Sequence, residues 1–228
     1  FIFALTAIGL APSNSYAADT QQAESEVLVA QGVVAYDERR YDDALRLLSR
    51  SRELNPGNSR GLYYLGLTQL ALKNPSEAVS ALEAALQLQL TDPAIGYQLG
   101  VAYFTAGRYD EATPLLEQAF KTDPSSENLG YYVGLGRYRQ KDYKQAIEAF
   151  NATKTSDPNV QQLTRFYRGL ALGVLGMSQQ ASAELRQLEA TGTNLPFTGQ
   201  ALQIQQALAA GRKTDETKRL RLQVSVGG

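Results

Sequence analysis

The stretch PAIGYQLGVAYFTAGRYDEATPLLEQAFKTDPSS (93–126) decides the fold, because it contains two helical patterns joined by a short turn. Its apolar side chains recur three or four positions apart, as they do on one face of an α-helix. They are Tyr97, Val101 and Phe104 in the first half, and Ala112, Leu115, Leu116 and Ala119 in the second. The turn lies at 106–108, and Pro124 follows the second pattern, where the residue before a proline resists the helical conformation. We therefore predict a helical hairpin.

The same hairpin recurs along the chain with a period close to 34 residues. Two columns of small residues show it, each with spacings of 34, 34, 34 and 35. The columns are Gly32, Gly66, Gly100, Gly134 and Gly169, and Ala44, Ala78, Ala112, Ala146 and Ala181. Further columns hold proline (Pro56, Pro124, Pro158) and an aromatic residue (Tyr41, Tyr109, Tyr143). Several columns in phase over five copies indicate a structural repeat.

The small residues have a packing reason. Glycine and alanine have almost no side chain, so the two helices of a hairpin can approach closely where they cross. A bulky residue at such a crossing would overpack the contact. One hairpin cannot bury its apolar face alone, whereas stacked hairpins can. The sequence therefore predicts an all-α protein of stacked helix pairs.

This pattern resembles the tetratricopeptide repeat. The signature offsets of that family are matched best in 93–126, by Leu99, Gly100, Ala102, Tyr103, Gly107, Tyr109, Ala112, Ala119 and Pro124. Five repeats are expected, the last one degraded: 25–58, 59–92, 93–126, 127–160 and 162–190. The resemblance implies a right-handed superhelical solenoid of antiparallel helix pairs, in which the first helix of each pair lines a concave groove.

The first residues predict a secretory signal. Residues 1–11, FIFALTAIGLA, are apolar and have about the length of a signal-peptide core, and Pro12 interrupts the run. Ser15 and Ala17 are the small residues that signal peptidase prefers, so we expect a signal peptide over 1–17 and a linker over 18–24. The alternative is a buried apolar helix, against which Pro12 and the polar residues after it argue.

A capping helix is expected over 197–210, followed by a charged linker. In RLRLQVSVGG (219–228) apolar and polar residues alternate, which predicts a short C-terminal β-strand. A secretory start, helical repeats and such a strand together resemble the periplasmic repeat region of bacterial outer-membrane β-barrel proteins. Polysaccharide-export porins and surface-lipoprotein assembly modifiers are examples. The resemblance implies the periplasm of a Gram-negative bacterium, with 211–228 as the linker and start of a barrel. The alternative is a frayed tail.

The resemblance to the repeat family also places candidate binding residues on the groove. Position five of each first helix faces the groove in this family, and here it is aromatic in four successive repeats. Aromatic rings offer a large contact area at a small cost in side-chain entropy. The predicted groove residues are Tyr63, Tyr64, Tyr97, Phe104, Tyr131, Tyr138, Arg139 and Phe166. The alternative is that many of these aromatic residues pack between repeats.

Composition excludes several kinds of chemistry. The 228 residues include no His and no Cys. The chain therefore lacks the usual ligands of zinc, copper and haem, and it lacks the histidine that a Ser-His-Asp or Cys-His triad requires. The net charge of −1 gives no basic excess for nucleic acid. Carboxylates leave magnesium, calcium and acid–base chemistry formally open, but no catalytic constellation is found. We therefore expect no enzymatic activity, no cofactor, no metal and no nucleic-acid partner.

A chaperone partner is not expected either. Tetratricopeptide repeats that clamp the acidic tail of a cytosolic chaperone carry Lys, Asn and Arg in the groove. The corresponding residues here are Val29, Val33, Tyr64, Ala94 and Gln98. We expect a non-enzymatic scaffold that binds an extended or helical segment of another protein. The alternative is the periplasmic part of an outer-membrane protein whose partner is polysaccharide-export or outer-membrane assembly machinery.

Overall fold

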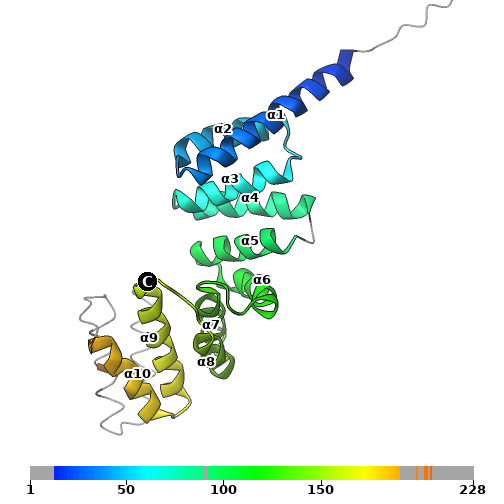
Figure 1. Ribbon diagram of the computed structural model, residues 1–228. Coiled ribbons are helices and arrows are strands. Elements are labelled where there is room, and N and C mark those ends of the chain that lie inside the picture. Colours follow the sequence, from blue (N-terminus) through cyan, green and yellow to red (C-terminus); the bar gives the residue numbers. More distant parts are fainter. Residues whose placement is uncertain (1–12, 90–91, 191–198, 200–202, 205, 207–228) are drawn as a thin grey trace, which may run out of the picture. The chain divides into compact units, whose positions relative to one another are not determined.

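The computed structural model describes residues 13–89, 92–190, 199, 203–204 and 206. Over these residues it forms ten α-helices, and successive helices fold back on one another as hairpins (Figure 1). The helices are α1 (Ser13–Asp37), α2 (Tyr41–Leu54), α3 (Ser59–Ala71), α4 (Pro75–Leu88), α5 (Pro93–Thr105), α6 (Tyr109–Thr122), α7 (Leu129–Arg139), α8 (Tyr143–Asn151), α9 (Pro158–Val174) and α10 (Ser178–Ala190). The prediction of an all-α protein built from helix pairs is confirmed.

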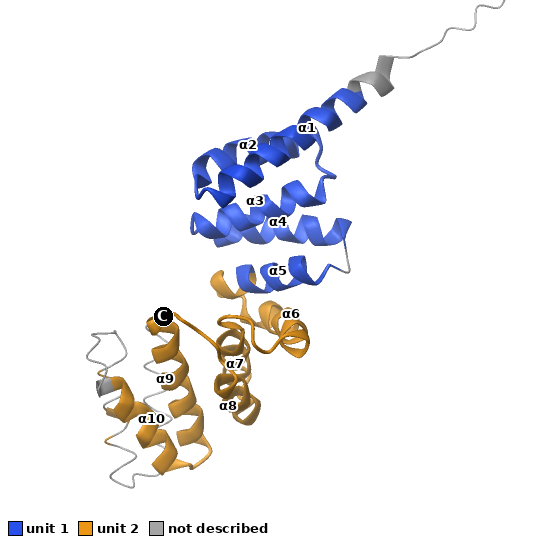
Figure 2. Cartoon of the chain, in the orientation of Figure 1, with its two compact units in different colours: residues 1–102 blue, residues 103–228 orange. Residues whose placement is uncertain are grey.

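Two compact units divide the chain, residues 1–102 and residues 103–228 (Figure 2). In unit 1, α1 packs against α2 and α3, and α3 packs against α2 and α4. In unit 2, α7 packs against α6, α8 and α9, and α9 packs against α8 and α10. In both units a first helix therefore contacts its own second helix and the second helix of the repeat before it.

The glycine column lets a large side chain of the second helix rest on the backbone of the first. A Cβ added at Gly32 would lie 2.6 Å from Leu48 Cγ, which is too close for two carbon atoms. The corresponding pairs are Gly66 with Leu82, Gly134 with Phe150, and Gly169 with Leu185. The large partner stands four residues after the alanine column in each repeat, and those alanines are buried as well. The helices therefore approach closely, as predicted, and one large side chain of the second helix fills the space that each glycine leaves. The sequence alone does not identify that side chain.

Each hairpin turns through a residue with positive φ at the same position of its repeat. These residues are Arg39 (60°), Lys73 (63°), Gly107 (77°), Lys141 (67°) and Gly176 (79°). In the third repeat the amide of Gly107 donates to the carbonyl of Phe104 (3.0 Å) and that of Arg108 to Tyr103 (2.8 Å). The same two bonds close the other four helices, and they satisfy the last free carbonyls of a helix. Positive φ strains a residue that has a side chain, so the two glycine turns avoid a strain that the other three contain.

Two predicted boundaries differ from the structure. Residues 18–24, expected as a linker, continue α1, and their alanines and glutamines favour a helix. The fifth repeat was expected to begin at 162, but α9 begins at Pro158. Proline suits the first helical position, and the Asp157 side chain caps the helix by accepting a hydrogen bond from the Asn159 amide (2.8 Å).

The predicted capping helix at 197–210 lies largely outside the described residues. Of its residues, Gly199, Gln203, Ile204 and Gln206 are described, and all four are helical. Ile204 is buried in a cluster with Phe166, Leu170, Leu185 and Leu188 of α9 and α10. The predicted linker and strand at 211–228 and the first twelve residues of the predicted signal lie outside the described part of the chain.

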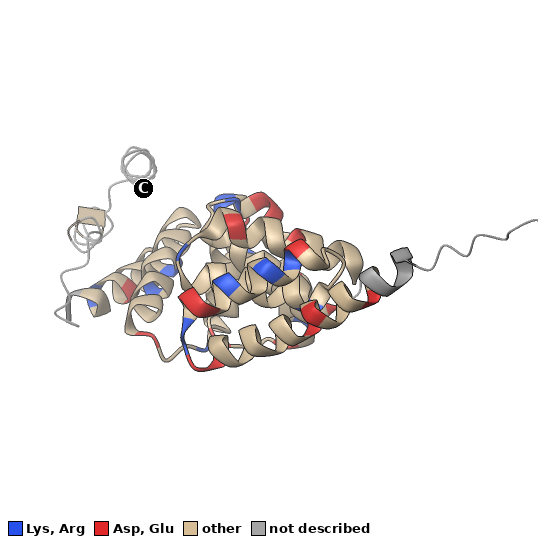
Figure 3. Ribbon diagram, turned by 90° about the horizontal axis from the view of Figure 1, so that it is seen from above, with Lys and Arg blue, Asp and Glu red and all other residues tan. Residues whose placement is uncertain are grey.

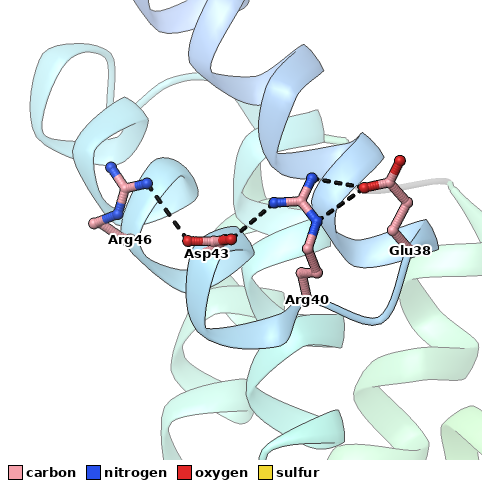
Figure 4. A network of polar contacts seen from close by, with 4 residues as sticks. All are labelled: Glu38, Arg40, Asp43 and Arg46. Carbon is pink, nitrogen blue, oxygen red and sulfur yellow. Dashed lines mark hydrogen bonds and ion pairs between the residues drawn. The ribbon is translucent and has the colours of Figure 1, made fainter.

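An exposed network of ion pairs closes the turn between α1 and α2 (Figure 4). The Arg40 guanidinium donates to Glu38 Oε2 (2.9 and 2.6 Å) and to Asp43 Oδ2 (2.8 Å), and Arg46 lies 3.6 Å from Asp43 Oδ1. The hydrogen bonds to Glu38 and Asp43 raise the pKa of Arg40, and the bond from Arg40 lowers the pKa of Asp43. Because all four side chains are exposed to water, this network orients the start of α2 and adds little to stability.

The positive-φ turns give the first testable prediction. A Cβ added at Gly107 meets nothing within 4 Å, so Gly107→Ala tests backbone strain alone and should lower the free energy of unfolding by about 1 kcal/mol. Lys141→Gly should raise the free energy of unfolding by about 0.5 kcal/mol, because the relieved strain exceeds the added freedom of the unfolded chain. Urea denaturation followed by circular dichroism measures both changes.

Gly96 supplies the matched control. A Cβ there also meets nothing within 4 Å, but Gly96 lies inside α5. Gly96→Ala should therefore raise the free energy of unfolding by about 0.5 to 1 kcal/mol. Changes of the same sign in Gly107→Ala and Gly96→Ala would contradict the role of backbone strain at the turn.

Candidate functional site

Many aromatic side chains of the first helices join one repeat to the next. Tyr36 of α1 meets Tyr64 of α3, with ring centroids 5.8 Å apart. The equivalent pairs in unit 2 are Phe104 with Tyr132 (4.7 Å) and Tyr138 with Tyr167 (5.4 Å). In each pair one ring stands in the last turn of a first helix, and the other lies further from the end of the next first helix. The predicted residues Tyr64, Phe104 and Tyr138 therefore pack between repeats, and each of them remains half-buried, so that a contact with a partner stays a prediction.

Two predicted groove residues lie in the core. Tyr131 exposes 7% of its surface and Phe166 exposes 1%. Tyr131 clusters with Ala146 and Phe150 of α8, and Phe166 clusters with Leu185 of α10. Because side chains from the second helices cover them, Tyr131 and Phe166 offer no accessible ring to a partner, contrary to the role predicted for them.

The predicted residues of unit 1 are half-buried. Tyr63 and Tyr64 are neighbours on α3 with ring centroids 5.4 Å apart, and burial raises the pKa of Tyr63. The Arg60 Cζ atom lies 6.0 Å from the centroid of the Tyr64 ring. Tyr97 on α5 is half-buried as well. All three tyrosines retain exposed surface, and their contact with a partner stays a prediction.

In unit 2 the Arg139 side chain lies over an aromatic ring. Its Cζ atom is 3.9 Å from the centroid of the Tyr109 ring at the start of α6. The Tyr109 ring meets Phe104 edge-on at 5.1 Å, and Phe104 in turn contacts Tyr132. Arg139 is exposed, and the three rings are half-buried. We call these four residues, together with the nearby Tyr167, the Arg139 surface.

The charge of Arg139 acts on two tyrosines close to it. Burial raises the pKa of Tyr131 and of Tyr167 above the ordinary value of 10.0, and in both the positive charge of Arg139 opposes the rise. The hydroxyl groups therefore stay neutral at physiological pH. A cation held against an aromatic face and beside neutral hydroxyls favours a ligand that brings negative charge and accepts hydrogen bonds.

Arg139 differs from its neighbours in having no ion pair with a carboxylate among the described residues. Arg137 pairs with Glu117 and, at 3.8 Å, with Asp142. Arg165 lies 3.6 Å from Glu184. The charges of Arg137 and Arg165 are therefore balanced within the protein, whereas the charge of Arg139 is available to a ligand.

Sequence reasoning predicts Arg139 and Phe104, but it does not predict the Tyr109 ring on which Arg139 lies. Tyr109 stands 30 residues earlier, in the aromatic column that begins the second helices. The regular recurrence of that column indicates a structural role. No sequence signal places an arginine of the next repeat on its ring. Tyr132 and Tyr167 share a column with the predicted Tyr64, and that column is the signal by which they can be found.

The described part of the chain lacks two kinds of feature. It contains no group of three or more His, Cys, Asp or Glu side chains placed to hold a metal ion. None of the helices within it is both long enough and apolar enough to cross a membrane. The expectation that the protein has no enzymatic activity stays a prediction.

Comparison with known proteins identifies the repeat. Models of the tetratricopeptide repeat match residues 29–93 and 69–129. Residues 29–129 therefore consist of tetratricopeptide repeats. Hsc70-interacting proteins 1 and 2 of Drosophila melanogaster are each 32% identical over 90 residues, which cover 38% of this chain and 24% of theirs. The chain thus spans about a quarter of these relatives.

Solved tetratricopeptide repeat structures share the fold. YrrB, described as having an unusual peptide-binding site, superposes with a TM-score of 0.67 at 15% identity, over 85% of this chain and all of that one (100%). MamA superposes with a TM-score of 0.63 at 18% identity, over 75% of this chain and 93% of that one. At these identities the likeness establishes the solenoid fold alone.

Unfolding at alkaline pH tests whether the pKa values of Tyr131 and Tyr167 are raised in the folded protein. Because the folded-state pKa values of Tyr131 and Tyr167 are raised, the folded protein keeps protons that the unfolded chain loses above about pH 10. The stability that they contribute is therefore complete below that pH and falls as the pH rises through the folded-state values. Urea unfolding at pH 8, 10 and 11 should show a steeper fall above pH 10 in the original protein than in Tyr131→Phe/Tyr167→Phe. Equal slopes in the two proteins would contradict the assignment.

Proposed function

We propose that the protein is a non-enzymatic scaffold whose Arg139 surface binds a partner segment bearing a carboxylate. The observation that carries this proposal is the exposed guanidinium, 3.9 Å from the centroid of the Tyr109 ring and without a carboxylate partner among the described residues. The tetratricopeptide repeat family supports a protein as the binding partner. YrrB supports a peptide as the kind of ligand that this fold accommodates.

The chemistry of the surface describes the segment that fits it. A planar guanidinium presents several N–H donors in a fork that matches a carboxylate, and these bonds are stronger than neutral ones. The stacking on Tyr109 restricts the side chain, so less freedom is lost when a ligand binds. The half-buried rings of Phe104 and Tyr132 beside it offer apolar area. An acidic residue next to an aromatic or aliphatic one therefore fits the surface best.

Tyr63, Tyr64 and Tyr97 of unit 1 are proposed as a second set of partner contacts, separate from the Arg139 surface. Each lies on a first helix, and each keeps part of its ring exposed. The Arg60 side chain beside Tyr64 repeats in unit 1 the combination of arginine and tyrosine found at Arg139. These contacts rest on the sequence pattern and on exposure, so they are secondary to Arg139.

Peptide selection tests the proposal. A random twelve-residue peptide library displayed on phage is selected against the full chain, and recovered peptides are measured by fluorescence anisotropy. Peptides with Asp or Glu beside an apolar residue should be enriched. Arg139→Gln should weaken their binding by about tenfold, because it removes the charge and the forked donors. Peptides without acidic residues, or equal binding by Arg139→Gln, would refute the proposal.

Lys144→Gln is the matched control. Lys144 is exposed on α8 in the same unit, and its loss changes the net charge by the same amount as Arg139→Gln. Binding by Lys144→Gln should stay within about twofold of the original, because an exposed charge away from the surface is screened by salt. An equal loss in both variants would show that net charge and not the Arg139 surface determines binding.

A periplasmic location is also part of the proposal, and it rests on the sequence of 1–17. Removal of residues up to Ala17 would shorten α1 by its first turn and leave every described core residue in place, since the first buried residue of α1 is Ser25. The protein isolated from its native host should begin at Ala18, and it should be released by osmotic shock. An intact N-terminal segment in the cytoplasmic fraction would contradict this location.

The outer-membrane alternative rests on residues 219–228 alone. The alternating pattern there lies outside the described residues, and no structural observation adds to it. The name of the Drosophila relatives concerns Hsc70, but the chain spans about a quarter of those proteins. The expected lack of carboxylate-clamp binding therefore stays a prediction from the sequence.

A further inference from the structure

The outward face of α1 has an apolar stripe. Val27 is 57% exposed and Val34 is 53% exposed. Ala23 and Ala30 are exposed as well, and the spacing of these four residues places them on one side of the helix. Single exposed apolar residues are ordinary on a protein surface, whereas a continuous line of them indicates an interaction site. We call these four residues the α1 stripe.

In every later repeat the corresponding positions are buried. The residues equivalent to Val27 in the later repeats are Gly61, Ile95, Leu129 and Thr164. The residues equivalent to Val34 are Thr68, Ala102, Gly136 and Ala171. Ile95 and Leu129 expose no more than 2% of their surface, and Thr68 and Ala102 expose none (0%). Exposure at these two columns is therefore particular to the first repeat.

The helices of the preceding repeat bury these positions. A Cβ added at Gly61 would lie 2.9 Å from Val29 Cγ2 on α1 and 3.4 Å from Ser51 Oγ on α2. A Cβ added at Gly136 would collide with Thr113 on α6, the second helix of the repeat before it. The α1 stripe is therefore the surface that receives the helices of a preceding repeat elsewhere in the chain.

The charges on α1 itself are all negative. Within Ser13–Asp37, α1 has four acidic residues and neither Lys nor Arg, and Figure 3 shows its acidic positions as red bands. At helical spacing Glu26 and Asp37 follow one edge of the stripe, and Glu24 follows the other. Pairing two copies of α1 would bring these carboxylates together, which like-charge repulsion opposes. A partner with positive charge on both edges is favoured.

We propose that the α1 stripe docks an amphipathic helix of a partner protein, with aliphatic residues on one face and Lys or Arg along both edges. This helix takes the place that the second helix of a preceding repeat occupies elsewhere. The second helices α2, α4 and α6 have 14 residues each, so a partner helix of comparable length covers the stripe. Binding of an amphipathic helix through aliphatic residues at i, i+3, i+4 and i+7 is an established mode of recognition. The proposal does not depend on the Arg139 surface.

A pair of synthetic helical peptides tests the proposal on the full chain. Both have 18 residues with leucine at helical spacing, and they differ only in Lys or Glu at the positions that flank the leucines. Fluorescence anisotropy should show that the Lys peptide binds at least about tenfold more tightly than the Glu peptide. Val27→Ser/Val34→Ser should weaken binding of the Lys peptide by at least about tenfold. Because both valines are more than half exposed, the variant should keep the original melting temperature.

Two further variants distinguish the stripe from other binding surfaces. Leu88→Ser removes an apolar side chain of similar exposure (49%) on α4 and should bind the Lys peptide as the original does. Glu24→Lys/Glu26→Lys should reverse the preference toward the Glu peptide. Equal binding of the Lys peptide by the Val27→Ser/Val34→Ser variant, or no binding by the full chain, would overturn the proposal. A concentration-dependent dimer that the valine substitutions abolish would assign the stripe to a second copy and overturn it as well.

Discussion

The contact between a large side chain and a glycine backbone sets the distance between the two helices of a hairpin. It recurs as Leu48 on Gly32, Leu82 on Gly66, Phe150 on Gly134 and Leu185 on Gly169. Because the helices are held this close, the connecting turn has to reverse the chain within a few residues. Three turns do so with a strained Arg or Lys at positive φ. These turns keep that strain because the surrounding packing compensates for it.

Much of the fold follows from the sequence because its determinants are periodic. Columns of Gly and Ala in phase with two helical patterns leave few arrangements other than paired helices. Boundaries are less predictable, because local propensity competes with the repeat. The repeat pattern indicates a start at 25, yet the residues before it favour a helix and α1 extends to Ser13. At the fifth repeat, Pro158 begins α9 before the position that the period indicates.

The candidate site is less predictable than the fold for a related reason. Position five is half-buried at Tyr63 and buried at Tyr131, although the residue and its place in the repeat are the same. The difference arises from the neighbours, since Tyr131 belongs to a cluster with Phe150 of α8, whereas Tyr63 packs on a cluster that contains Ala85 of α4. Arg139 can be assigned to the surface from its position. Its stacking on Tyr109 depends on how two repeats pack, which no single repeat specifies.

The two candidate surfaces differ in charge, and they therefore select different ligands. At the Arg139 surface lies a cation that has no ion-pair partner within the described part of the chain, and half-buried rings surround it. Along α1, aliphatic side chains lie between carboxylates. An acidic segment suited to the first surface is repelled by the second, and a basic helix suited to the second is repelled by the first. The two proposed surfaces therefore suit partners of opposite charge.

The aromatic pairs between repeats also affect how the chain opens. Phe104 with Tyr132, and Tyr138 with Tyr167, each join two repeats of unit 2. When one repeat frays, a ring of the next repeat loses its contact and becomes exposed to water. Fraying of one repeat therefore weakens its neighbour, as in a linear array whose stability depends on nearest-neighbour contacts. Hydrogen exchange in the first helices α7 and α9 is accordingly expected to be coupled, with the opening of one repeat favouring the opening of the next.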